Sequence, residues 1–204
     1  MSKEQAGYGD TSSAAFIGNS GSAESVGIAG HYVAECFDAQ GNLKWSEKFD
    51  NLVTAAGKQA MFDFYFGATG AAGGTASGVN YLGLVGGTAT FAAADTMATH
   101  TWTEVGLANA PAYTGNRQSP TWTAASSSGT SPSNVTTKAA SAVSFTFTSA
   151  GTVQGCFING GAAASATKDT TVGVLYSAGA FSGGARVVAA TDQLNVTYST
   201  TATS

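Results

Sequence analysis

The sequence predicts a mainly β fold: an antiparallel β-sandwich or jelly-roll-like domain with one amphipathic helix and an extended N-terminal arm. Several short segments alternate apolar and polar residues with period two, Gly- and Ser-rich turns separate them, and a single stretch has the helical period instead. A length of 204 residues suits one β-rich domain. We expect an arm over residues 1–27 and one β-sandwich domain over residues 28–204.

The first 27 residues have no sustained hydrophobic period, but Tyr8, Phe16 and Ile17 stand out among Gly, Ser and Ala. One interpretation is a flexible extension. The other is an arm that lies across a neighbouring subunit, with these three side chains as its anchors. The sequence leaves both interpretations open.

A β-hairpin is predicted next. Residues 31–37 alternate apolar and polar side chains, "DAQGN" forms a turn centred on Gly41, and Leu43, Trp45 and Phe49 continue the alternation beyond it. A helix of about three turns follows the hairpin. Its apolar residues recur at helical spacing from Gly57 to Tyr65, Thr54 can cap its start and Gly67 can end it.

After a Gly/Ala-rich loop, the chain is predicted to be β throughout. Strands are expected within residues 81–85, 100–106, 142–148, 152–160, 171–179 and 193–200, which with the hairpin makes about eight. Val143, Phe145 and Phe147 should face the core, as should Leu194, Val196 and Tyr198. The segments 126–134 and 182–192 have the composition of turns.

The composition excludes several classes of partner. Charged residues make up 10% of the chain, the net charge is −4 and no run of Lys or Arg occurs, so we expect no nucleic-acid binding. No apolar run is long enough to cross a membrane, and the N-terminus lacks a signal-peptide core, so we expect no membrane partner and synthesis in a cytoplasm. Cys36 and Cys156 are expected to be free thiols in the core rather than a disulfide.

Chemistry-bearing residues are sparse. The two histidines, His31 and His100, belong to no metal-binding pattern, and no nucleophile elbow, phosphate loop or dinucleotide-binding glycine motif occurs. The acidic residues before position 64 alternate with lysines, which is typical of a solvated face rather than of a carboxylate pair for glycoside hydrolysis. We therefore expect no catalytic residues, no metal and no cofactor, with a glycan depolymerase as the enzyme alternative.

The stretch "AYTGNRQSPTWT" at 112–123 holds one of the two arginines of the chain. Tyr113, Arg117 and Trp122 could form a recognition loop, because Tyr, Trp and Arg dominate binding hot spots. Arg117 could equally act as a structural clasp that ties loop carbonyls or Glu104 together, with Trp122 turned into the core. The clasp is the favoured interpretation; if the stretch binds anything, we expect protein at a subunit seam.

The order of these motifs resembles a family of small virion structural proteins of tailed bacteriophages. The resemblance spans residues 28–200 and includes the "DAQGNLKW" hairpin, the "NLVT" helix start, the Tyr113–Arg117 spacing, the "SFTF" strand and the closing "TDQLNVTY" strand. The chain departs from the family pattern at Thr191, where other members have Gly, and at residues 118–120, between Arg117 and Trp122.

This resemblance implies a capsid decoration, or cement, protein on the virion surface that stabilises the head shell by bridging capsid subunits. The implied partners are the major capsid protein and further copies of the chain, as a dimer or a trimer. A tail fibre or host-receptor-binding virion component is the alternative, in which Tyr113 and Trp122 would stack on sugars.

Overall fold

The computed structural model describes residues 27–54, 57, 61, 79–87, 89–122, 126–128 and 135–203. Within this part of the chain twelve strands form, and every pairing between them is antiparallel. The strands are β1 (Gly27–Phe37), β2 (Leu43–Val53), β3 (Tyr81–Gly86), β4 (Thr103–Glu104), β5 (Ser126–Ser128), β6 (Val135–Ala139), β7 (Val143–Thr146), β8 (Gly151–Val153), β9 (Gly155–Gly160), β10 (Val174–Ala180), β11 (Arg186–Val188) and β12 (Gln193–Thr203). The predicted mainly β, antiparallel class is confirmed.

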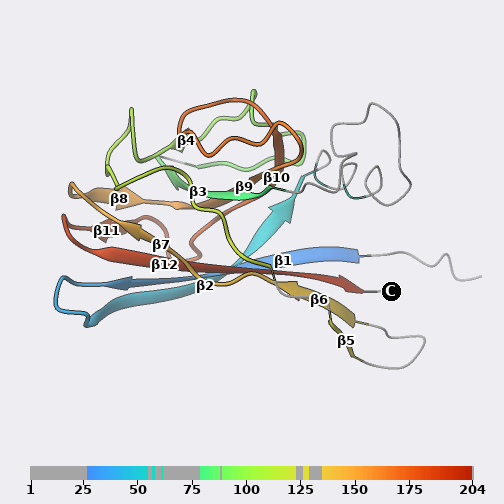
Figure 1. Ribbon diagram of the computed structural model, residues 1–204, viewed down its shortest axis with the longest axis horizontal. Coiled ribbons are helices and arrows are strands. Elements are labelled where there is room, and N and C mark those ends of the chain that lie inside the picture. Colours follow the sequence, from blue (N-terminus) through green and yellow to red (C-terminus); the bar gives the residue numbers. More distant parts are fainter. Residues whose placement is uncertain are drawn as a thin grey trace, which may run out of the picture.

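Ten of the strands form one strongly curled sheet in the order β4-β3-β9-β10-β2-β1-β12-β6-β5, with β7 also paired to β12. The curl arises in β2, which pairs with β1 as far as Asn51 and then with β10 through Leu52 and Val53. Figure 1 shows this strand rising from the part of the sheet that holds β1 and β12 toward the part that holds β10. β8 and β11 pair only with each other.

The core lies between the two parts of the curled sheet. Its fully buried side chains come from β1 and β12 on one side and from β3 and β9 on the other, and Tyr32, Tyr198, Leu84 and Ile158 are examples. The Tyr32 hydroxyl lies 2.8 Å from Ser177 Oγ on β10, so a hydrogen bond joins the two parts across the core. Because the predicted alternation placed Phe145, Phe147, Leu194, Val196 and Tyr198 inward, this half of the core was predicted correctly.

The hairpin is confirmed, with one local change. Gly41 adopts a φ of +84° in the turn, a conformation that glycine reaches without strain. A bulge between Cys36 and Phe37 shifts the register, so Leu43 pairs with Phe37 on the outer face and is 55% exposed.

Other boundaries also differ from the predictions. The segment 100–106 contributes only the two-residue β4, and the segment 152–160 divides at Gln154 into β8 and β9, which belong to different sheets. β5, β6 and β11 lie in segments that were predicted as turns or were not predicted at all. β5 and β6 are rich in Ser and Thr and lack the apolar alternation that identifies a half-buried strand, while β11 has only three residues, too few to show a period.

The structure describes two residues of the predicted helix and the predicted capping residue before them. Thr54 Oγ1 accepts a hydrogen bond of 3.0 Å from the Gly57 amide, the spacing of an N-cap side chain, and Gly57 and Met61 are both helical. The remaining residues of the predicted helix, and residues 1–26 of the predicted arm with Tyr8, Phe16 and Ile17, lie outside the described residues, while Gly27 begins β1.

Buried and exposed side chains alternate along β7, and this alternation predicts how two neighbouring substitutions affect stability. Replacing the fully buried Phe145 with Ala should lower the free energy of unfolding by about 3 to 5 kcal/mol, because the lost ring leaves a cavity between the two parts of the sheet. The neighbouring Thr146→Ala change, on the exposed face, should alter it by less than about 0.5 kcal/mol. Chemical denaturation measures both, and equal losses would contradict the assignment of faces.

Burial of both cysteines generates a second prediction. Cys36 and Cys156 lie fully buried as unpaired thiols, and burial raises the pKa of Cys36 to about 11 and that of Cys156 further. Neither thiol should react with Ellman's reagent in the folded protein, and both should react once guanidinium unfolds it. Rapid reaction of the native protein would show that the core opens or that a thiol is accessible.

Candidate functional site

The predicted site residues of the 112–123 stretch do not form an exposed loop. Tyr113 and Arg117 are each only 3% exposed, and Trp122 is half-buried, with its ring 6.0 Å from that of Tyr198. A buried Tyr113 cannot stack on a sugar, so that part of the receptor-binding interpretation is wrong. The role of these residues as contacts for another protein stays a prediction.

Arg117 is the centre of a buried polar cluster. Its Nε and one Nη donate to the two carboxylate oxygens of Glu104 at 2.8 and 2.6 Å. The remaining donors reach the Ser165 carbonyl at 3.0 Å and the carbonyl and hydroxyl of Thr170 at 2.9 and 3.2 Å. All five guanidinium N–H groups are therefore engaged, and the group lies over the Phe157 ring at 5.3 Å.

Glu104 is positioned by strand pairing. It lies on β4 opposite Val85 of β3, is 7% exposed and accepts a further hydrogen bond of 2.7 Å from the Asp169 amide. Its backbone carbonyl accepts from Asn109 Nδ2 at 2.9 Å. The bidentate geometry that only an arginine fork provides thus joins a strand end to two loops.

Lys168 adds a second cation to the same end of the fold. Its Nζ donates to the carbonyls of Gly106 and Tyr113 at 2.7 and 3.0 Å and lies 4.1 Å from the centre of the Tyr113 ring. Burial lowers the pKa of Lys168, while the charges of Glu104 and Asp169 raise it. The lysine therefore ties the loop after β4 to the loop after β9, as Arg117 does.

This cluster can hold the fold together, but it offers nothing to a substrate. The arginine donors are all used, the Glu104 carboxylate is paired, and no nucleophile stands beside a base. The geometry agrees with the clasp interpretation of Arg117.

A second arrangement crosses the outer face of the sheet. Ser199, His31 and Asp50 stand opposite one another on β12, β1 and β2, and Ser199 Oγ lies 2.8 Å from His31 Nε2. Burial, followed by the charge of Lys48, lowers the pKa of His31, and Asp50 opposes this effect. Sequence reasoning missed this row because only strand pairing brings its three members together.

The row does not amount to a catalytic triad. Within the described residues, no hydrogen bond or ion pair joins His31 to Asp50, so the imidazole lacks its orienting partner. β1 is a central strand whose backbone amides pair with β2 and β12, which leaves no free amides there to stabilise an oxyanion.

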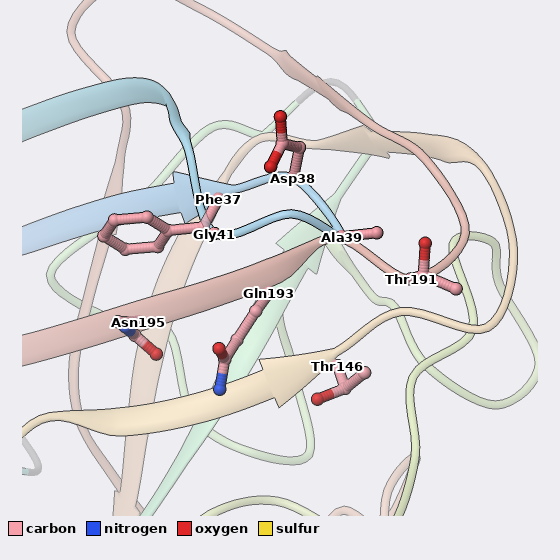
Figure 2. Close-up of a pocket in the computed structure, with 8 residues that line it drawn as sticks. All are labelled: Phe37, Asp38, Ala39, Gly41, Thr146, Thr191, Gln193 and Asn195. Atoms are coloured by element: carbon pink, nitrogen blue, oxygen red, sulfur yellow. The ribbon is translucent and has the colours of Figure 1, made fainter.

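A shallow depression of about 450 Å³ lies at the far end of the same outer face, beside the β1–β2 turn. Figure 2 shows side chains from the end of β1, the β1–β2 turn, the end of β7, the start of β12 and the loop before β12 around the depression. Its lining residues are Phe37, Asp38, Ala39, Gly41, Thr146, Thr191, Gln193 and Asn195. Sequence reasoning did not identify any of them as a site, because they come from three separate segments.

Comparison with protein-family models, curated proteins and solved structures finds no match for this chain. In the part of the chain that the structure describes, no group of three His, Cys, Asp or Glu side chains is placed to hold a metal ion. No helix among the same residues is long and apolar enough to span a membrane.

The clasp generates a prediction with a matched control. Arg117→Ala should lower the free energy of unfolding by about 3 to 5 kcal/mol, because it leaves the Glu104 carboxylate buried without its partner. Arg117→Lys should lose less, since it keeps the charge without the fork. Arg186→Ala, which breaks the partly exposed pair with Glu47, should cost about 1 kcal/mol or less.

Denaturation curves of the three variants measure these differences. If Arg117→Ala unfolds the protein altogether, Arg117→Lys still separates the buried pair from the exposed one. Equal losses for Arg117→Lys and Arg186→Ala would contradict the clasp.

Proposed function

We propose that the chain is a bacteriophage capsid decoration protein, a structural rather than a catalytic component of the virion. We further propose that its curled sheet is a β-sandwich of the jelly-roll-like type. It would stabilise the head shell by bridging subunits of the major capsid protein, as a dimer or trimer on the capsid surface. The sequence resemblance over residues 28–200 and the low content of charge support this function.

The observation that carries the proposal is the pairing of β1 with β12 along their whole lengths. Gly27 lies opposite Thr203 at one end of this ribbon, and Phe37 lies opposite Gln193 at the other. Eleven residues in β conformation extend about 35 Å. In Figure 1 the start of β1 and the C-terminus lie at the same end of the molecule.

This arrangement suits a protein that is fixed at one end. Residues 1–26, with the predicted anchors Tyr8, Phe16 and Ile17, join the folded body at the Gly27 end of the ribbon. Within this body, the buried Arg117 cluster joins the loop after β4 to the loop after β9. Weak contacts between the anchor residues and a capsid subunit would add up to firm attachment, because the symmetry of the shell repeats them many times.

The copy number of the protein in purified virions tests the class of function. A decoration protein should be present in numbers on the order of hundreds per particle, comparable with the capsid subunit. Quantitative mass spectrometry of whole virions provides the ratio. A handful of copies per particle would contradict the decoration role and would favour the tail fibre or receptor-binding alternative.

A variant of the full chain tests the anchoring end. Combined replacement of Tyr8, Phe16 and Ile17 with Ala should reduce co-sedimentation with capsids that lack the protein by at least about tenfold, because anchor side chains carry most of the energy of an interface. Its melting temperature should stay unchanged. Val187→Ala, at a 67% exposed apolar residue on β11, is the control. Undiminished binding of the triple variant would contradict anchoring through this segment.

A further inference from the structure

The depression at the β1–β2 turn is almost free of available charge. Asp38 is the only ionisable residue in its lining, and its carboxylate is engaged within the turn. It accepts hydrogen bonds from the amides of Gln40 and Asn42 at 2.9 and 2.8 Å and from Asn42 Nδ2 at 3.0 Å. The bonds from Asn42 are the main cause that lowers the pKa of Asp38 and keeps it ionised.

Neutral hydrogen-bonding groups make up most of the remaining lining. Gln193 is exposed, and its amide forms no side-chain hydrogen bond within the described residues. Asn195 accepts a bond of 2.5 Å from Ser144 Oγ through Oδ1, which leaves its Nδ2 donor available. Thr146 and Thr191 add hydroxyl groups, although the Thr191 hydroxyl already donates to the Ala190 carbonyl and can therefore only accept a hydrogen bond from a ligand. Amides and hydroxyls of this kind recognise the hydroxyl groups of a neutral ligand.

Phe37 supplies an apolar surface beside these groups. Its side chain belongs to the outer face, is half-buried, and lies in register with Gln193. No aromatic contact is found between its ring and another described side chain. Figure 2 shows the ring together with Gln193 and Asn195 on the strands that border the depression. The face of an aromatic ring attracts the C–H groups of a sugar, because the ring face is electron-rich.

Thr191 is held in a strained conformation at the rim. Its φ is +71°, a region that a β-branched residue rarely adopts and that costs about 1 to 2 kcal/mol relative to ordinary backbone. Glycine would take this φ without strain, yet the chain places a threonine there. Strain of this kind is concentrated at functional sites, where a side chain is needed in a fixed place.

We propose that this depression binds a neutral saccharide, with one sugar ring stacked on Phe37 and its hydroxyl groups bound by Gln193, Asn195 and the two threonines. An anionic ligand is disfavoured, because no Lys or Arg lines the depression and the Asp38 carboxylate is ionised. A volume of about 450 Å³ falls in the range of small-ligand sites. The inference does not depend on the proposed decoration role, since it rests on the lining residues alone.

The direct test is nuclear magnetic resonance of the isotope-labelled full chain titrated with neutral oligosaccharides built from glucose, galactose, mannose, rhamnose or N-acetylglucosamine. At least one of them should shift the amide resonances of residues 37–41 and 191–195 in a saturable manner. Phe37→Ala should weaken that binding by about tenfold, equivalent to about 1.4 kcal/mol. Val187→Ala, outside the depression, should leave it unchanged.

Thr191→Gly separates a ligand contact from a structural one. This variant should melt at a higher temperature, since it relieves the positive φ, while it binds the saccharide more weakly. Unchanged binding would remove Thr191 from the site. The proposal is overturned if no saccharide of the panel shifts these resonances, if Phe37→Ala binds as the parent does, or if only capsid protein shifts them, which would mark a protein contact.

Discussion

The full-length pairing of β1 with β12 is the constraint on which the rest of the structure depends. It joins segments at opposite ends of the described chain through eleven residue pairs and places Tyr32 beside Tyr198, both fully buried, with ring centres 4.8 Å apart. β2 pairs with the other edge of β1. On the edge of β12 that faces away from β1, β7 pairs with the first part of the strand and β6 with the last part. Because β2 then leaves β1 to pair with β10, the sheet curls and encloses the core.

The buried pair of Arg117 and Glu104 stabilises a part of the fold that the pairing of β1 with β12 does not reach, namely the loops after β4 and β9. The loops after β4 and β9 carry many backbone carbonyls and little apolar surface, and such carbonyls need donors when they are buried. Arg117 and Lys168 supply those donors from side chains. A long apolar residue could fill the same space, but it would leave the carbonyls and the Glu104 carboxylate without partners.

Much of the fold could be predicted from the sequence, because alternation is strong where one face is buried. Phe145 and Tyr198 illustrate this, as does the turn at Gly41. β5 and β6 could not be predicted, since strands of small and polar residues are recognisable only through the partners that they pair with, and β11 could not because its three residues are too few to show a period. The partnership of Arg117 with Glu104 was foreseen from chemistry, whereas the depression depends on strand register, which no local pattern reveals.

The two proposals place their binding sites at opposite ends of one ribbon. The Gly27 end joins the segment predicted to hold the capsid, and the Phe37 end carries the proposed saccharide site. A cryo-electron microscopy map of virions that contain the protein tests this orientation most directly. The account predicts density for the chain across capsid subunit boundaries, with Gly27 and Thr203 against the shell and the β1–β2 turn directed outward. Density confined to the tail, or the turn buried against the shell, would contradict it.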